Sequence, residues 1–209
     1  MYLQLLQNLL QKDQGNGGIH DTAFFGCWPG HANIFTSRRR GFSEFVGTTN
    51  LSGFTPMIAE SVESWINKRK MPFFLTVSLG GKVMLRNNGG RIVLTSSVAG
   101  SLGLVNHEAI AAAKGGLEGL VKSAAATYAK NNIRVNALAL GLVESNLSNG
   151  IVSNPAALEV SKKMHSIGSI GSPEIIAKFA TPLILDSSSW ITGSIFNIDG
   201  GLSTTKLVS

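Results

Sequence analysis

The sequence predicts an α/β protein built on a doubly wound parallel sheet, and three segments of its second half support this. Residues 91–96 form a short, β-branched apolar run between glycines and polar residues, which is typical of a buried strand. The alanine-rich residues 106–128 are expected to form a helix, and residues 132–138 are expected to form the next strand. A strand, a helix and a strand in this order predict a right-handed crossover between parallel neighbours.

The length and composition indicate one globular domain over residues 1–209. Of the 209 residues, 44% are hydrophobic and 14% are charged, enough for a sizeable core. Residues 66–205 carry the regular pattern, whereas residues 1–65 are divergent. Two interpretations stay open for the sheet: residues 22–50 supply atypical strands, or the sheet is incomplete at its N-terminal strands.

The charge and cysteine content narrow the partners and the compartment. The net charge is +6, with basic runs at residues 38–40 and 68–70, but no aromatic residues interleave them, so we expect solvated surfaces rather than nucleic-acid binding. A lone Cys27 excludes an intrachain disulfide and favours a reducing, cytoplasmic location. No run reaches the roughly 18–20 apolar residues of a membrane span, and residues 1–10 make a poor signal peptide.

Polar residues follow the first predicted strand. Ser96 and Ser97 stand at its end, and Lys114 falls on the helix that comes next. In open parallel sheets ligands bind outside the carboxyl ends of the strands, so this is where we expect a site. These residues also have a purely structural interpretation, in which the strand-end hydroxyl caps backbone groups and Lys114 is a surface lysine.

The stretch 89–114 resembles the short-chain dehydrogenase/reductase family, which carries a strand-end Ser and, about 13 residues later, a Tyr-x-x-x-Lys helix. Ser97 and Lys114 match, whereas Ile110 occupies the Tyr position. Residues 138–147 resemble the family's Pro-Gly-x-Val-x-Thr segment, and residues 188–201 resemble its closing Ile-Thr-Gly and Asp-Gly-Gly motifs. Asn67 lies about two residues from the family's Asn position, and Arg69 occupies that position.

The resemblance implies a Rossmann-like fold that binds NAD or NADP and transfers a hydride between the cofactor and a carbonyl or alcohol of a small-molecule substrate. It implies Ser97 and Lys114 as catalytic residues, and a homo-oligomer formed through the 106–130 helix. The cofactor contacts that it implies are Lys114, Gly141, Val143 and Ser145.

The proton donor is the open question, because an isoleucine side chain cannot transfer a proton. His107, three residues before Ile110 and on the same helical face, is a candidate, since imidazole exchanges a proton near neutral pH. The alternative interpretation of His107 is a polar residue that faces solvent at the start of a helix.

Two functions remain: an oxidoreductase that uses Ser97, Lys114 and either His107 or an ordered water, or a catalytically inactive scaffold or subunit-interaction protein. Gly15, Gly17 and Gly18 form either a phosphate-binding turn or an ordinary turn.

Overall fold

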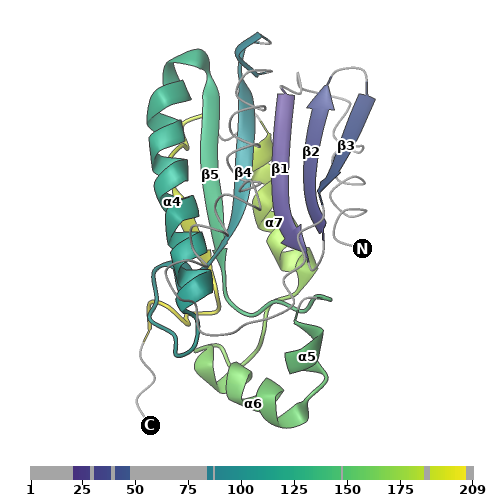
Figure 1. The fold of residues 1–209 in the computed structure, drawn as a ribbon, viewed down its shortest axis with the longest axis vertical. Coiled ribbons are helices and arrows are strands. Elements are labelled where there is room, and N and C mark those ends of the chain that lie inside the picture. Colours follow the sequence, from purple (N-terminus) through teal and green to yellow (C-terminus); the bar gives the residue numbers. More distant parts are fainter. Residues whose placement is uncertain are drawn as a thin grey trace.

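The computed structural model of the chain describes residues 21–28, 31–38, 41–47, 84–86, 88–146, 148–185 and 189–205. These residues form one six-stranded sheet with the strand order β3-β2-β1-β4-β5-β6 (Figure 1). The strands are β1 (Asp21–Trp28), β2 (His31–Arg38), β3 (Gly41–Gly47), β4 (Gly90–Ser97), β5 (Ile133–Leu140) and β6 (Ile195–Ile198). The helices are η1 (Val98–Gly100), α4 (Glu108–Tyr128), η2 (Ala129–Asn131), α5 (Asn149–Val152), α6 (Pro155–Met164) and α7 (Pro173–Ile184).

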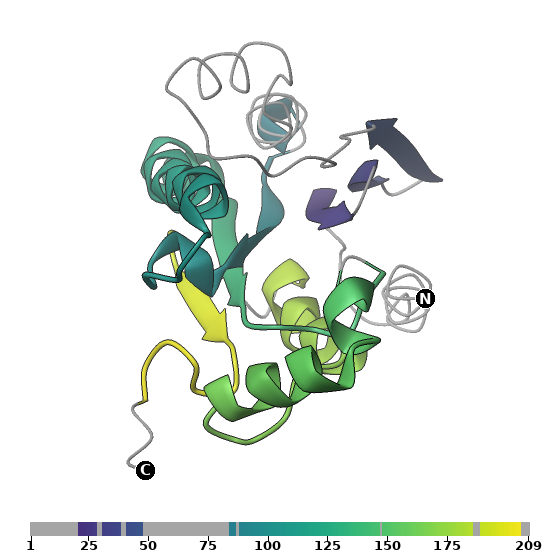
Figure 2. The same ribbon diagram turned by 60° about the horizontal axis from the view of Figure 1, so that its bottom comes forward.

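The second half of the chain has the predicted parallel arrangement. β4 pairs in parallel with β1 and β5, and β5 pairs in parallel with β6. Helix α4 covers one face of these strands and α7 covers the other, so the sheet is doubly wound here (Figures 1 and 2). Alternate residues of β4 point to opposite faces of the sheet. Ile92 and Leu94 belong to the hydrophobic cluster under α4, whereas Val93 belongs to the cluster under α7.

The N-terminal strands are present, but they form a meander rather than a series of crossovers. β2 pairs antiparallel with β1, and β3 pairs antiparallel with β2. Only two residues separate β1 from β2 and β2 from β3, and so short a connection joins antiparallel strands, whereas a parallel pair needs a crossover of a dozen residues or more. The predicted parallel arrangement therefore holds for β1, β4, β5 and β6, and the sheet as a whole is mixed.

Local signals set the ends of several elements close to their predicted positions. Helix α4 begins at Glu108, two residues after the expected Asn106, which has a positive φ of 61°. Helix α7 begins after Ser172, whose side chain accepts a hydrogen bond from the Ile175 amide at 3.5 Å, and Pro173 stands in its first turn, as is typical of a helix start.

Two of the predictions lie outside the described residues: the glycine turn at Gly15–Gly18 and the role of Asn67. None of the described helices combines the length and apolarity needed to cross a membrane.

Candidate active site

The carboxyl ends of β4 and β5 lie side by side and form the edge where the predicted site residues meet. Ser97, the last residue of β4, pairs in register with Leu140, the last residue of β5. Helices α5 and α6 lie beyond this edge, at the lower end of the molecule in Figure 1. The arrangement brings the Ser97 segment next to the segment that follows β5, as a strand-end site requires.

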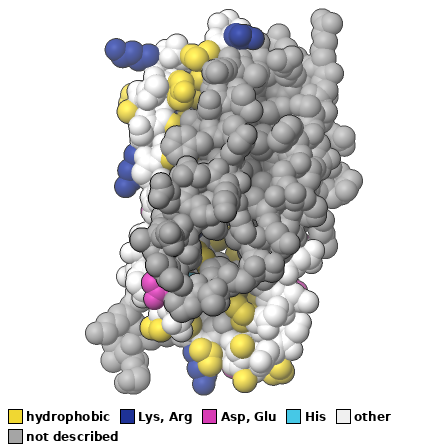
Figure 3. Space-filling view, in the orientation of Figure 1, with side chains coloured by type: hydrophobic (Ala, Val, Ile, Leu, Met, Phe, Trp, Pro, Cys, Tyr) yellow, Lys and Arg dark blue, Asp and Glu magenta, His cyan; other side chains and the backbone are white. Residues whose placement is uncertain are grey.

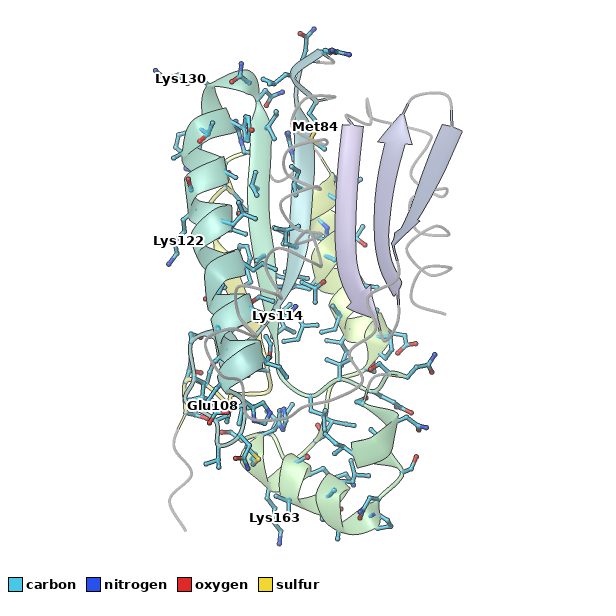
Figure 4. The ribbon with its side chains drawn as sticks, in the orientation of Figure 1. Met84, Glu108, Lys114, Lys122, Lys130 and Lys163 are labelled. Carbon is cyan, nitrogen blue, oxygen red and sulfur yellow. The ribbon has the colours of Figure 1, made fainter. Side chains whose placement is uncertain are left out.

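Lys114 links helix α4 to the carboxyl end of strand β4. Its ammonium group donates a hydrogen bond to the Thr95 carbonyl oxygen at 2.8 Å, and the side chain is half-buried. Figure 4 shows Lys114 on the side of α4 that faces the sheet, whereas Lys122 points outward from the same helix. Lys114 is therefore not an ordinary surface lysine, and it places a positive charge beside the end of the serine strand.

The Ser97 hydroxyl caps the short helix that follows it. Its oxygen accepts a hydrogen bond from the Ala99 amide at 3.3 Å. A hydroxyl has two lone pairs and one hydrogen, so this cap leaves its hydrogen able to reach a ligand oxygen. The capping interpretation of Ser97 and a ligand-binding role are thus compatible.

The neighbouring Ser96 serves the core instead. It is 3% exposed, and its hydroxyl donates to a carboxylate oxygen of Glu118 at 2.9 Å. Glu118 lies one helical turn after Lys114, so two polar side chains of α4 reach the end of β4. Together they fix the position of this strand end against the helix.

Two glycines let the turn after β4 lie against α4. A Cβ on Gly100 would lie 2.9 Å from the Glu118 carboxylate and 3.0 Å from the Lys114 carbonyl carbon. A Cβ on Gly115 would lie 3.2 Å from the Gly100 oxygen. This close approach explains a glycine inside a helix, where it costs about 1 kcal/mol relative to alanine.

Ile110 and His107 lie at the start of α4. Ile110 is half-buried, one helical turn before Lys114. His107 precedes the helix, and its Nδ1 is 2.7 Å from the Val105 oxygen. Because a carbonyl oxygen can only accept, Nδ1 carries the hydrogen and Nε2 is the nitrogen that can take up a proton. The role of His107 stays a prediction.

The segment after β5 contains the other predicted residues. Val143 forms an isolated bridge with Gly171, and the Leu142 amide donates to His165 Nε2 at 3.1 Å. The Ser145 hydroxyl lies 3.2 Å from the Ser148 hydroxyl and accepts from the Ser148 amide at 3.3 Å. Residues 141–145 are therefore an ordered turn beside Ser97, with the Ser145 hydroxyl engaged by the start of α5.

His165 and Asp199 meet at Gly141, and our sequence reasoning assigned neither a role. His165 is 3% exposed, and a Cβ on Gly141 would lie 2.7 Å from its Nε2 and 3.0 Å from the Asp199 Cα. The sequence signal was weak, since a histidine after Lys162 and Lys163 is typical of an exposed helix end.

The Asp199 carboxylate is held in its charged form. Its oxygens accept from the amides of Gly201 at 3.0 Å and Ser203 at 2.8 Å, and from the Ser203 hydroxyl. Burial raises the pKa of Asp199, but these hydrogen bonds outweigh burial, so its pKa lies below the ordinary value.

Apolar side chains are exposed on the helices beyond this polar edge. Figure 3 shows hydrophobic side chains at the lower end of the molecule, over α5 and α6. On these two helices, Ile151, Val160 and Met164 are 40%, 61% and 43% exposed. The edge thus combines hydrogen-bonding groups at the strand ends with apolar surface on the helices beyond them.

Known proteins resemble the chain in sequence. A family model described as enoyl-(acyl carrier protein) reductase matches residues 40–203. Cyclohexanol dehydrogenase of Acinetobacter sp. is 35% identical over 147 residues, which cover 69% of this chain and 57% of that protein. The 3-oxoacyl-[acyl-carrier-protein] reductase of Thermotoga maritima is 33% identical over 156 residues, covering 75% of this chain and 63% of that protein. The chain thus spans less than two thirds of these relatives.

Solved structures share the fold. A gluconate 5-dehydrogenase from Burkholderia cenocepacia, in complex with NADP and tartrate, has a TM-score of 0.70 at 21% identity, covering 99% of this chain and 73% of that one. A 4-hydroxyisoleucine dehydrogenase complexed with NADH has a TM-score of 0.58 at 33% identity, covering 65% of this chain and 56% of that one. Because the family model spans well over half of the sequence and the neighbours share the sheet, the chain belongs to the short-chain dehydrogenase/reductase family.

Proposed function

We propose that this chain is an NAD(P)-dependent oxidoreductase that transfers a hydride between the nicotinamide and a carbonyl or alcohol carbon of a small molecule. The observation that carries the proposal is the Lys114 ammonium, bonded to the Thr95 carbonyl at 2.8 Å beside the Ser97 strand end. The relatives support it, since they are named as dehydrogenases and reductases, and both similar structures described above hold NADP or NADH.

The donors at this edge suit the nicotinamide end of such a cofactor. The Lys114 ammonium donates to the Thr95 oxygen and places its positive charge beside the Ser97 strand end. The hydroxyl hydrogen of Ser97 and the backbone of residues 141–145 lie at the neighbouring strand ends. Ribose hydroxyls and a carboxamide are matched by donors of this kind. A bound nicotinamide supplies or accepts the hydride, and the protein provides orientation and the proton.

Each side chain then has a separate task in the proposed reaction. Ser97 donates to the substrate oxygen and fixes its position. The positive charge of Lys114 stabilises the negative charge that develops on that oxygen. His107 Nε2 delivers or removes the proton, directly or through an ordered water, because Ile110 cannot.

We further propose that the chain forms a homo-oligomer through α4. The outer face of this helix carries small exposed residues at helical spacing: Ala112, Gly116, Gly119 and Ser123. Side chains this small allow another helix to approach closely. We place the protein in the cytoplasm, for which the support is its single cysteine.

A fluorescence titration with NADH and NADPH tests the cofactor proposal. We expect saturable binding by the wild-type protein, weakened at least tenfold by Lys114→Ala, because a charge-assisted hydrogen bond contributes about 1.5–3 kcal/mol. Lys122→Ala is the matched control, since Lys122 is exposed on the same helix. A folded wild-type protein that binds neither dinucleotide would refute hydride transfer.

Two further variants separate enzyme from scaffold. Ile110→Tyr supplies a proton donor one turn before Lys114, and we expect the rate of carbonyl reduction to rise about 10²–10⁴-fold. His107→Ala should abolish the activity of the wild-type chain, while His107→Gln, which cannot carry the proton, should not restore it. Dinucleotide binding without turnover in both the wild type and Ile110→Tyr would favour the inactive scaffold.

A further inference from the structure

His165 joins three segments that are distant in the sequence. It directly follows α6, and its ring lies against Gly141 after β5 and near Asp199 after β6. The backbone continues the same junction: the Ile167 amide donates to the Gly200 oxygen at 3.2 Å. The ring is 3% exposed, so it is part of the interior.

The two ring nitrogens make two hydrogen bonds of opposite sense. Nδ1 is 2.7 Å from the Ser161 carbonyl oxygen, and Nε2 is 3.1 Å from the Leu142 amide nitrogen. A carbonyl oxygen can only accept and an amide N–H can only donate. Both partners therefore require the same neutral tautomer, with the hydrogen on Nδ1 and a lone pair on Nε2.

The Nε2 bond controls the segment that the proposed function needs. Leu142 stands between Gly141 and Val143, at the strand end beside Ser97. The Nδ1 bond ties the same ring to the last turn of α6. Gly141 has no Cβ, which would lie 2.7 Å from Nε2, so the backbone and the ring are in direct contact.

We propose that His165 is a positioning residue: it holds residues 141–145 in place for the nicotinamide side of the cofactor and couples them to α6. This rests on the proposed function, because the segment matters for activity only if a dinucleotide binds there. His165 touches neither substrate nor cofactor, and it acts through the Leu142 amide. Removal of the Nε2 acceptor should leave that amide without its partner and loosen the segment.

A pair of variants separates the two hydrogen bonds. In His165→Gln the side-chain oxygen reaches the place of Nε2 and can accept from Leu142. In His165→Asn the amide nitrogen replaces Nδ1 and can donate to Ser161, but nothing reaches Leu142. A role in general packing would respond to the loss of side-chain volume in both variants, so comparison of the two isolates the acceptor.

Amide hydrogen exchange of the cofactor-free protein is the first readout. We expect the Leu142 amide to exchange about tenfold faster in His165→Asn and within about twofold of the wild type in His165→Gln. The second readout is the dissociation constant for NADH, which we expect to rise about fivefold in His165→Asn and to stay near the wild-type value in His165→Gln. Nitrogen-15 shifts of the wild-type ring should show a hydrogen on Nδ1.

The outcomes distinguish this proposal from the proposed function. Equal exchange rates of the Leu142 amide in the two variants, or a ring with its hydrogen on Nε2, would overturn the proposal that His165 Nε2 holds the Leu142 amide. The expected exchange pattern with unchanged NADH affinity overturns the positioning role and leaves the oxidoreductase standing. A wild-type protein that binds no dinucleotide refutes the proposed function and with it the cofactor role of the segment, while the exchange pattern still decides whether His165 holds it. If His165→Asn does not fold, the wild-type ring shifts decide the hydrogen-bond arrangement.

Discussion

The turns after β4 and β5 lie side by side at one edge of the sheet, but they are held in different ways. The end of β4 is held from the middle of the 21-residue helix α4, through Lys114 to Thr95 and Glu118 to Ser96. The turn after β5 is held by His165, which directly follows the ten-residue helix α6. Each clamp joins a helical segment to a strand end, but the anchoring helices differ in length and in burial.

This difference separates a fixed side of the site from an adjustable one. Helix α4 packs its residues Leu117 and Val121 into the core, whereas α6 has no fully buried residue. A displacement of α6 would therefore reach the turn after β5 through His165, while the Ser97 and Lys114 side would stay with the core. We expect the groups that act on the substrate to be rigid and the cofactor-side segment to respond to α6.

The largest expected effect is on the turn after β4. Gly100→Val would force a side chain against the Glu118 carboxylate and the Lys114 backbone, 2.9 and 3.0 Å from the new Cβ. We expect the free energy of unfolding to fall by about 3 kcal/mol, the upper range for overpacking. Urea denaturation measures it. Gly103→Val is the control, since a Cβ there meets nothing within 4 Å. Equal midpoints for the two variants would show that the turn is not tightly held.

The matching change on the turn after β5 is Gly141→Ala. Its Cβ would lie 2.7 Å from His165 Nε2 and 3.0 Å from the Asp199 Cα. We expect a loss of about 2 kcal/mol, smaller than at Gly100 because the ring and α6 can move away. Faster exchange of the Leu142 amide should accompany it. Gly150→Ala, where a Cβ meets nothing within 4 Å, should not lower stability. A larger loss at Gly141 than at Gly100 would reverse the comparison.

Low pH should destabilise the turn after β6, in which Asp199 lies next to Gly141 of the turn after β5. The native pKa of Asp199 lies below its ordinary value of about 3.8, so its contribution to stability is complete above that value and is lost as the pH falls through the native pKa. We expect Asp199→Ala to be less stable by about 1–2 kcal/mol at pH 6, and this difference should shrink below about pH 4. Chemical denaturation of both proteins across pH 6 to 3 measures it. A gap that widens in acid would mean that the carboxylate is not stabilised in the native state.

The smallest effect concerns the outer face of α4, the rigid anchor. Gly116 and Gly119 have nothing within 4 Å of an added Cβ, so replacement of either by alanine should stabilise the helix by about 1 kcal/mol. If α4 packs against a second copy, the same changes should weaken the oligomer. Thermal unfolding and sedimentation measure the two effects separately. A loss of stability in a protein that is monomeric throughout would contradict the exposed position of this face.

The second half of the fold could be predicted because its signals are local. Buried β-branched runs marked β4 and β5, and the Ser172-Pro173 pair marked the start of α7. The spacing from Ser97 to Lys114 placed both at one edge, but the sequence did not show that the ammonium reaches the Thr95 oxygen, 19 residues away. That contact depends on how α4 lies against the sheet.

The sequence predicted neither the contacts of His165 nor the meander of β1 to β3, and the reason differs between the two. His165 meets Leu142 and Asp199 across 23 and more residues, and nothing in its local sequence marks burial. The strands of the meander mix polar and apolar residues without a clear period of two, as in Ala32 to Ser37 of β2. Their direction follows from two-residue connections, whereas the strand–helix–strand pattern of the second half predicts helical crossovers and parallel pairs.

The mixed sheet also has a consequence for the order in which the chain folds. β1, β2 and β3 pair with their immediate neighbours in sequence, and β4 and β5 are joined through α4, so the pairs within each part are closer in sequence than the pairs between β1 and β4. Among the described strands, the pairing of β1 with β4 joins the two parts, and in this seam Asp21 pairs with Gly90, roughly seventy residues further along the chain. Closing so long a loop costs conformational entropy, and the pairing of β1 with β4 can offset that cost only after the strands of each part have formed. We expect the seam to be the late, rate-limiting step of refolding; pulsed amide labelling that finds β1–β4 pairs protected before β4–β5 pairs would contradict this.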